Sequence, residues 1–235
     1  MPEVAMVAAL EREIWPLVRH WHVSGREYSG RRFRFFESEN RVAVCGGIGP
    51  QAARRAAEAV IALYRPALVQ SVGFAGALDT SLRVGELFEP RQVVDASDGS
   101  RADTGSGSGI LVSFSSVAGR DQKSRLATAY QAQAVDMEAA AVAKGAEAHG
   151  LRFAAVKAIS DDSTFAMPAM ERFIANEGDF RSGAFALHAA LRPWVWHSVF
   201  RLARNSARAS HRLCEYLGRN AGDLTTVSER GGSQK

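Results

Sequence analysis

The stretch AVDMEAAAVAKGAEAHGLRFAAVKAISD, residues 134–161, is the part of the sequence that indicates the fold most clearly. Its first half is rich in alanine and predicts a helix over residues 137–149. Its second half is short and almost entirely apolar, which predicts a buried strand over residues 153–159. A carboxylate stands at an end of each element, Glu138 where the helix starts and Asp161 just past the strand.

Strands and helices alternate along the rest of the chain as well. We expect strands at 4–9, 32–37, 41–45, 67–72, 85–94 and 110–114, and helices at 11–19, 51–64, 124–132, 169–175 and 181–191. The second and third strands should form a hairpin, and the Ser-, Gly- and Asp-rich residues 97–109 a surface loop. This alternation predicts an α/β fold, a three-layer α/β/α domain with a central mixed, mostly parallel sheet.

Length and composition indicate a globular domain followed by a basic extension. Of the 235 residues, 46% are hydrophobic and 23% are charged, as in a folded soluble domain. We place that domain at residues 1–192, a basic amphipathic helix at 193–217 and a disordered tail at 218–235. The net charge of +4 comes largely from the arginines of the helix, so it does not indicate a nucleic-acid partner.

The sequence gives no sign of secretion or of metal binding. Cys45 and Cys214 are far apart, and the six histidines are scattered without metal-ligand spacing. Residues 1–20 lack the order of a signal peptide, and no apolar run is long enough to span a bilayer. We therefore expect a cytoplasmic protein without a metal or other cofactor.

Residues 193–217 allow two interpretations. Trp196, Val199, Phe200 and Ala203 share one helical face, with arginines beside or opposite it. The helix could pack on the domain or on a subunit neighbour, or it could lie on an anionic membrane and make the protein peripheral at the inner membrane surface.

Three acidic residues are candidates for chemistry, because ligands bind beyond the carboxyl ends of the strands in such sheets. Asp161 emerges at the rim of the core, where burial would favour its protonated form; alternatively it caps a helix. Glu138 either caps its own helix or accepts hydrogen bonds from two hydroxyl groups, with Met137 beside it as apolar packing. Glu13 is either a general base or one charge of a solvated helix face.

Two glycine-rich segments also follow predicted strands, Gly46-Gly47-Ile48-Gly49 and Gly73-Phe74-Ala75-Gly76. The first could hold an anion or a water at a helix N-terminus, but a tight turn explains either segment equally well. Neither has the pattern of a P-loop or of a dinucleotide-binding loop.

Taken together, these segments resemble the purine nucleoside phosphorylase/uridine phosphorylase superfamily, most closely its 5′-methylthioadenosine/S-adenosylhomocysteine nucleosidase branch. The resemblance covers about residues 4–191, and its most specific parts are Val135-Asp136-Met137-Glu138-Ala139 and Ala158-Ile159-Ser160-Asp161. It implies a nucleoside phosphorylase-like catalytic domain that hydrolyses the glycosidic bond of a 5′-substituted adenosine and releases adenine. Family members commonly assemble, so the resemblance also implies a homo-oligomer.

The resemblance implies a role for each candidate residue. Asp161 would protonate the leaving purine, and Glu13 would activate the attacking water. The ribose would be bound by Glu138 and Met137, and the base by Val117 and Ser160. The nucleophile would be surrounded by the loop residues Gly47, Gly49, Phe74, Ala75 and Gly76.

Departures from the family pattern affect the expected reaction. Relatives often have serine where this chain has Phe74, and phosphorylases often have an arginine before this loop, where Gln70 and Ser71 stand here. A phosphate dianion without charged partners is costly to bury, which favours hydrolysis. The base-stacking aromatic is also missing, because Phe114 is displaced and Val117 is nearest. Two alternatives stay open: a phosphorolytic or lipid-directed relative that cleaves an adenosylhopane-type nucleoside, and a nucleoside-binding protein without catalysis.

Overall fold

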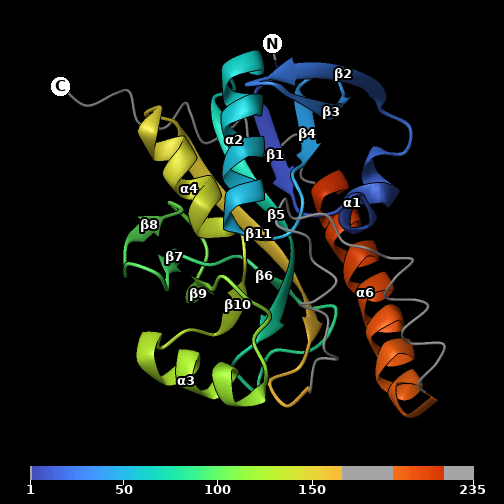
Figure 1. The fold of residues 1–235 in the computed structure, drawn as a ribbon, viewed down its shortest axis with the longest axis vertical. Coiled ribbons are helices and arrows are strands. Elements are labelled where there is room, and N and C mark those ends of the chain that lie inside the picture. Colours follow the sequence, from blue (N-terminus) through green and yellow to red (C-terminus); the bar gives the residue numbers. More distant parts are fainter. Residues whose placement is uncertain (1, 166–192, 220–235) are drawn as a thin grey trace.

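A mixed β-sheet forms the centre of the molecule (Figure 1). The computed structural model describes residues 2–165 and 193–219. Strand β5 (Leu68–Ala77) pairs in parallel with β1 (Val4–Ala8) along one edge and with β11 (Arg152–Asp161) along the other. Strand β4 (Arg41–Cys45) extends the parallel part beyond β1. The carboxyl ends of these central strands therefore lie at one end of the sheet.

The remaining strands extend the sheet on both sides. Parallel pairing continues among β10, β9 and β7, whereas β2, β3, β6 and β8 pair antiparallel with their neighbours. Their bounds are His22–Tyr28 for β2, Arg31–Glu37 for β3, Leu87–Phe88 for β6, Gln92–Asp95 for β7, Arg101–Asp103 for β8, Ile110–Ser113 for β9 and Ala134–Asp136 for β10. The predicted hairpin is thus present as β3 and β4.

Helices cover both faces of the sheet, which confirms the predicted three-layer α/β/α arrangement (Figure 1). One face carries α2 (Pro50–Tyr64) and α4 (Ala139–Ala148), and the other carries α1 (Glu11–Val18) and α6 (Pro193–Arg219). Helix α3 (Arg120–Tyr130) lies below β9 and β10 in Figure 1, near the carboxyl end of β11.

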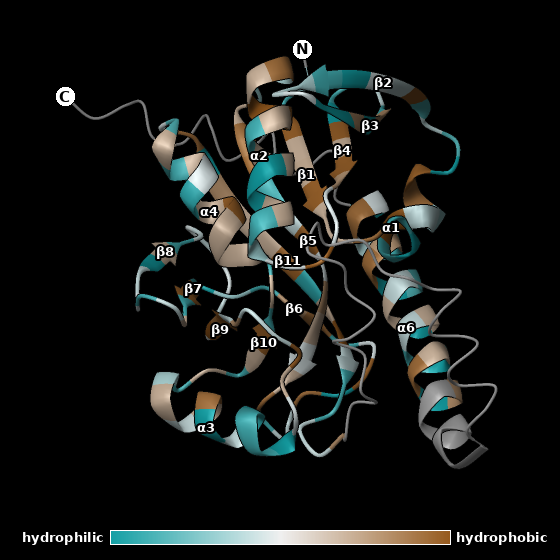
Figure 2. Ribbon diagram, in the orientation of Figure 1, coloured by the Kyte–Doolittle hydropathy of each residue, from teal (hydrophilic) through white to brown (hydrophobic). Residues whose placement is uncertain are grey.

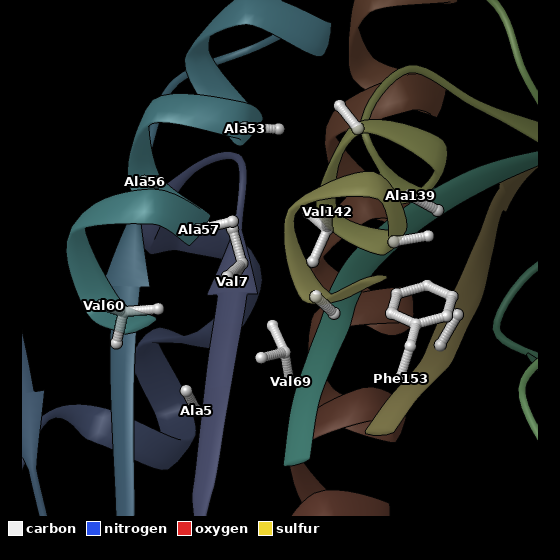
Figure 3. Packing of buried hydrophobic residues seen from close by; sticks show 14 of the residues in the cluster. Ala5, Val7, Ala53, Ala56, Ala57, Val60, Val69, Ala139, Val142 and Phe153 are labelled. Carbon is white, nitrogen blue, oxygen red and sulfur yellow. The ribbon is translucent and has the colours of Figure 1, made fainter. Parts of the chain in front are cut away.

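Small side chains let the two helices of the first face lie close to each other and to the sheet. Ala53, Ala56 and Ala57 of α2 pack toward Val142 of α4 and the buried strands (Figure 3). A Cβ placed on Gly145 of α4 would lie 3.3 Å from the Ala57 methyl group, so even an alanine there would require the helices to shift by a few tenths of an ångström. Figure 2 shows the same layering as hydrophobic β1 and β4 under partly hydrophilic helices.

The observed strands differ from the predicted ones where local sequence is a poor guide. Strand β2 was not predicted because it lies at the edge of the sheet and most of its residues are exposed, so it lacks an apolar face. Strand β10 has only three residues, and β8 falls inside the predicted loop 97–109. The glycines after Val72 were expected to end the strand, but β5 continues to Ala77. Glycine within a strand can mark a close approach of another group rather than a turn.

Helix α6 packs on the domain through its C-terminal half. Ala209, Leu213 and Leu217 are buried in one apolar cluster with Ile14 and Val18 of α1. In the other half Phe200 is 69% exposed, and no helix in the described part of the chain is long and apolar enough to cross a bilayer. Contact of residues 193–217 with an anionic membrane and homo-oligomerisation stay predictions. The helices expected at 169–175 and 181–191, the side chains of 194–199 and the tail from 220 onward lie outside the described residues.

Candidate active site

Glu13 is held in the first turn of α1, at the carboxyl end of β1. Its Oε2 accepts hydrogen bonds from the backbone N–H groups of Ala9 (3.2 Å) and Leu10 (3.3 Å), so the carboxylate caps its own helix. Only 6% of the residue is exposed. Burial raises the pKa of Glu13, and the nearby Lys157 ammonium opposes that rise. Glu13 is therefore a buried carboxyl group that caps its helix, and not one charge of a solvated helix face.

Glu138 occupies the N-cap position of α4 and binds the first glycine-rich loop. Its Oε1 accepts the backbone N–H of Gly49 at 2.8 Å, and its Oε2 accepts that of Met137 at 3.3 Å. Gly49 has φ +96°, in the left-handed region that favours glycine. Burial, followed by the negative charge of Asp136, raises the pKa of Glu138 to about 8. Glu13 also contributes to that rise, so the two site glutamates lie within electrostatic range of each other.

A buried ion pair lies beneath the two site glutamates. Lys157 Nζ of β11 contacts Asp136 Oδ2 at 2.9 Å and donates a hydrogen bond to Ser71 Oγ at 3.0 Å. Asp136 accepts further hydrogen bonds from the Ser113 hydroxyl (2.6 Å) and from the N–H of Ala139 (2.9 Å). Since Ala139 is the first residue of α4, this network fixes the helix end that carries Glu138.

The charge of Lys157 is maintained by its neighbours. Burial alone would lower the pKa of Lys157, but the carboxylates of Asp136 and Glu138 outweigh burial and raise it. The lysine therefore stays positively charged next to the site. Its charge limits how far the pKa values of both site glutamates can rise.

Asp161 lies at the carboxyl end of β11 and is only 2% exposed. Its Oδ1 accepts the Ser160 hydroxyl at 2.7 Å, and its Oδ2 forms an ion pair with Lys123 of α3. Lys123 Nζ also donates a hydrogen bond to the Asp162 carbonyl at 2.7 Å. The prediction considered burial alone, which favours a protonated Asp161. The structure shows Asp161 instead as one half of a buried ion pair with Lys123.

Strand β5 connects the two ends of the site. A Cβ on Gly73 would lie 2.8 Å from Glu13 Oε2, and a Cβ on Gly76 would lie 2.9 Å from Asp161 Oδ2. Three strand residues span roughly 10 Å, so Glu13 and Asp161 contact β5 at points about that far apart. Both glycines are needed because carboxyl groups occupy the space of their side chains. The structure thus places Glu13 within electrostatic range of Glu138, and Glu13 and Asp161 against glycines of the same strand.

The other predicted site residues have the following surroundings. Gly47 donates its N–H to the Ala9 carbonyl at 3.0 Å, and Ala75 accepts the Ser160 hydroxyl at 3.3 Å through its carbonyl. Phe74 is partly buried against the apolar cluster of β1, α1 and α6. Val117 is partly buried between β9 and α3.

The hydroxyl of Ser160 therefore orients Asp161, and its predicted contact with a base stays a prediction. Met137 is partly exposed beside Glu138. Sugar, base and nucleophile contacts of all these residues also stay predictions.

Sequence reasoning assigned no role to Lys157, Asp136 or Lys123. A signal was present for Lys157, because it is the only charge within the apolar run 153–159. Lys123 gave no such signal, since it belongs to the polar helix sequence RDQKSRLATAY. Among the described residues, no three His, Cys, Asp or Glu side chains are grouped so that they could hold a metal ion.

Comparison with solved structures gives the same fold for several nucleoside-cleaving proteins. Futalosine hydrolase of Helicobacter pylori is 16% identical, with a TM-score of 0.71 over 95% of this chain and 98% of that chain. The 5′-methylthioadenosine/S-adenosylhomocysteine nucleosidase of the same organism is 18% identical, with a TM-score of 0.70 over 95% and 99%. The S-adenosylhomocysteine nucleosidase of Streptococcus pyogenes is 18% identical, with a TM-score of 0.69 over 94% and 96%.

The sequence itself identifies the family. Comparison with curated proteins gave no match. The sequence profile described as Phosphorylase superfamily matches residues 3–115 and 108–190, most of the chain and all three acidic site residues. The chain therefore belongs to the phosphorylase superfamily.

Proposed function

We propose that this protein is an N-ribosyl hydrolase that cleaves the glycosidic bond of a 5′-substituted adenosine and releases adenine. The observation that carries the proposal is the grouping of Glu13, Glu138 and Asp161 around the glycines of β5 and the Gly49 loop. The similar structures include nucleosidases that act on 5′-methylthioadenosine and S-adenosylhomocysteine, as well as a futalosine hydrolase. Their TM-scores are nearly equal, so they do not distinguish a 5′-substituted adenosine from futalosine as the substrate. That choice needs an experiment.

In the proposed reaction each acidic group has a separate task. The glycosidic bond lengthens, positive charge develops on the ribose and negative charge on the purine. Glu138 accepts hydrogen bonds from the two ribose hydroxyls and holds the sugar in a reactive orientation. Glu13 takes a proton from the attacking water, and its raised pKa makes it a stronger base than an ordinary glutamate. Asp161 passes a proton to N7 of the leaving purine.

Hydrolysis fits this charge distribution better than phosphorolysis. Lys157 and Lys123, the lysines buried at this end of the sheet, are each paired with an aspartate. Phosphorylases often have an arginine, a cationic anchor for phosphate, just before the glycines of β5. Here Ser71 precedes these glycines, and it accepts a hydrogen bond from Lys157. A phosphate dianion would have to displace one of these partners, and an unpaired buried carboxylate is costly.

The test is chromatography of reaction mixtures with purified protein. 5′-Methylthioadenosine, S-adenosylhomocysteine, adenosine, inosine and futalosine are incubated separately, each with and without phosphate. We expect adenine from the 5′-substituted adenosines at the same rate in both conditions. An absolute requirement for phosphate would contradict hydrolysis, and hypoxanthine from futalosine alone would contradict the adenosine substrate.

Variants then test the site itself. Asp161→Asn should lower kcat/KM by about 10²–10⁴-fold, the usual contribution of a general acid. Asp103→Asn is the control, because Asp103 is an exposed aspartate of β8 paired with Arg91 at the surface. Full turnover by Asp161→Asn would exclude Asp161 as the acid, and ligand binding without any base release would identify a non-catalytic binding protein.

A further inference from the structure

Asp161, the proposed general acid, is paired with a lysine, although a neutral carboxylic acid would be the simpler proton donor. Lys123 and Asp161 have side chains that are each 3% exposed, so their charges are hidden from water. Asp161 accepts hydrogen bonds on both oxygens, one from the Ser160 hydroxyl and one from the Lys123 ammonium. A protonated carboxyl group has a proton to donate and needs an acceptor. The Ser160 hydroxyl can donate or accept, but the Lys123 ammonium can only donate, so Asp161 Oδ2 carries no proton in this ion pair.

In this arrangement Asp161 has no proton to give to the leaving purine. A purine leaves readily only when N7 gains a proton, and a carboxylate has none to give. The nearest proton belongs to Lys123, which already contacts the oxygen that would have to carry it. The second hydrogen bond of Lys123, to the Asp162 carbonyl at 2.7 Å, can persist after one proton has left, because a neutral amine still donates.

We propose that Lys123 is the source of the proton that Asp161 delivers to the leaving base. This inference rests on the proposed function and adds a residue that the acid depends on. As the glycosidic bond breaks, its electron pair stays with the purine and N7 becomes more basic. One N–H bond of the Lys123 ammonium breaks, Asp161 Oδ2 takes the proton, and the neutral Asp161 gives a proton to N7.

The protons balance over one turnover. Lys123 ends as a neutral amine, and Glu13 ends protonated after accepting a proton from the attacking water. The products are the free purine and the free sugar. Lys123 regains a proton and Glu13 loses one through solvent once the products leave. Since Lys123 acts through Asp161, it is a positioning and proton-supplying residue rather than one that touches substrate.

Two substitutions of Lys123 distinguish the effect of its proton from the effect of its charge. Lys123→Arg keeps a cation next to Asp161, but a guanidinium does not give up its proton in proteins. Lys123→Met removes both the charge and the proton at similar length. The control is Lys144→Met, because Lys144 also pairs with aspartates, Asp95 and Asp98, but in a partly exposed site that does not include Asp161.

Two substrates separate the acid step from the rest of the site. 5′-Methylthioadenosine needs a proton on its leaving base, whereas 4-nitrophenyl β-ribofuranoside loses a phenolate that is stable without one. We expect Lys123→Arg to lower kcat for methylthioadenosine by about 10²–10⁴-fold, with little change in KM. Lys123→Met should lose less, because Asp161 is then no longer half of an ion pair and solvent can supply its proton. Turnover of the nitrophenyl riboside should be unchanged, and Lys144→Met should retain both activities.

Each outcome decides the inference. Full methylthioadenosine turnover by Lys123→Arg would overturn it, because charge alone would then suffice. An equal loss on both substrates, or a loss that appears in KM alone, would also overturn it and indicate a structural role. Thermal melting of each variant shows whether it is folded. Failure of the wild-type protein to release adenine would instead contradict the proposed function, so the two failures are distinguishable.

Discussion

Removing the Lys157 ammonium should strongly destabilise the protein. Lys157 and Asp136 have side chains that are 1% and 0% exposed, and their charged atoms are 2.9 Å apart. Lys157→Met leaves Asp136 as an uncompensated buried carboxylate. Breaking a buried pair in this way costs about 3–5 kcal/mol. For a chain of 235 residues, this corresponds to a decrease of roughly 6–20 °C in Tm.

The assay is urea unfolding at pH 7, supported by thermal melting, with two comparisons. Lys144→Met breaks a partly exposed ion pair and should cost about 1 kcal/mol or less. Adding Asp136→Asn to Lys157→Met should recover part of the loss, because an asparagine oxygen can still accept the N–H of Ala139 but carries no charge. The reasoning is refuted if Lys157→Met is as stable as Lys144→Met, or if the double variant is less stable than Lys157→Met.

Three further changes test the geometry of the site. The native state keeps a proton on Glu138 up to about pH 8, whereas the unfolded chain loses it near the ordinary value of 4.5. Stability should therefore fall with pH in this window by up to about 1.4 kcal/mol per unit, and urea unfolding of Glu138→Gln should show a smaller decrease. Gly73→Ala (φ +145°) should abolish activity by pushing against Glu13, whereas Gly99→Ala (φ +74°, open space) should cost about 1 kcal/mol in stability and leave turnover intact. Ser210→Ala removes a hydroxyl that lies 3.0 Å from two backbone carbonyls of α1 and should lower the unfolding free energy by about 1 kcal/mol, measured in urea.

The layers of the fold could be predicted because apolar periodicity determines them. The run Val4–Ala9 and the run 153–159 are buried strands, and the alanine-rich segments around them become α2 and α4. Strand β2 could not be predicted in this way. It is held by pairing with β3 at the edge of the sheet, and its own residues carry no buried face.

The acidic residues of the site could be predicted, but their electrostatic partners could not. Glu13, Glu138 and Asp161 were visible because strand ends and helix starts in an α/β sheet share one edge. The partner of Asp161 comes from α3, 38 residues earlier in the chain, and a lysine in a polar helix looks like any solvated charge. Lys157 was visible as a lone charge in an apolar strand, yet nothing in the sequence identified the carboxylate that it pairs with.

The charges at this end of the sheet suit a substrate that is neutral when it binds and charged only in the transition state. Lys157 and Lys123 each neutralise one aspartate, and burial favours the neutral forms of the two site glutamates. A site whose buried lysines and aspartates cancel in charge can admit an uncharged nucleoside without a large electrostatic penalty. When the glycosidic bond breaks, the sugar becomes positive, and the carboxylate of Glu13 takes a proton from the water that attacks it. Interactions that strengthen only as charge develops stabilise the transition state rather than the bound substrate, which is the condition for raising kcat.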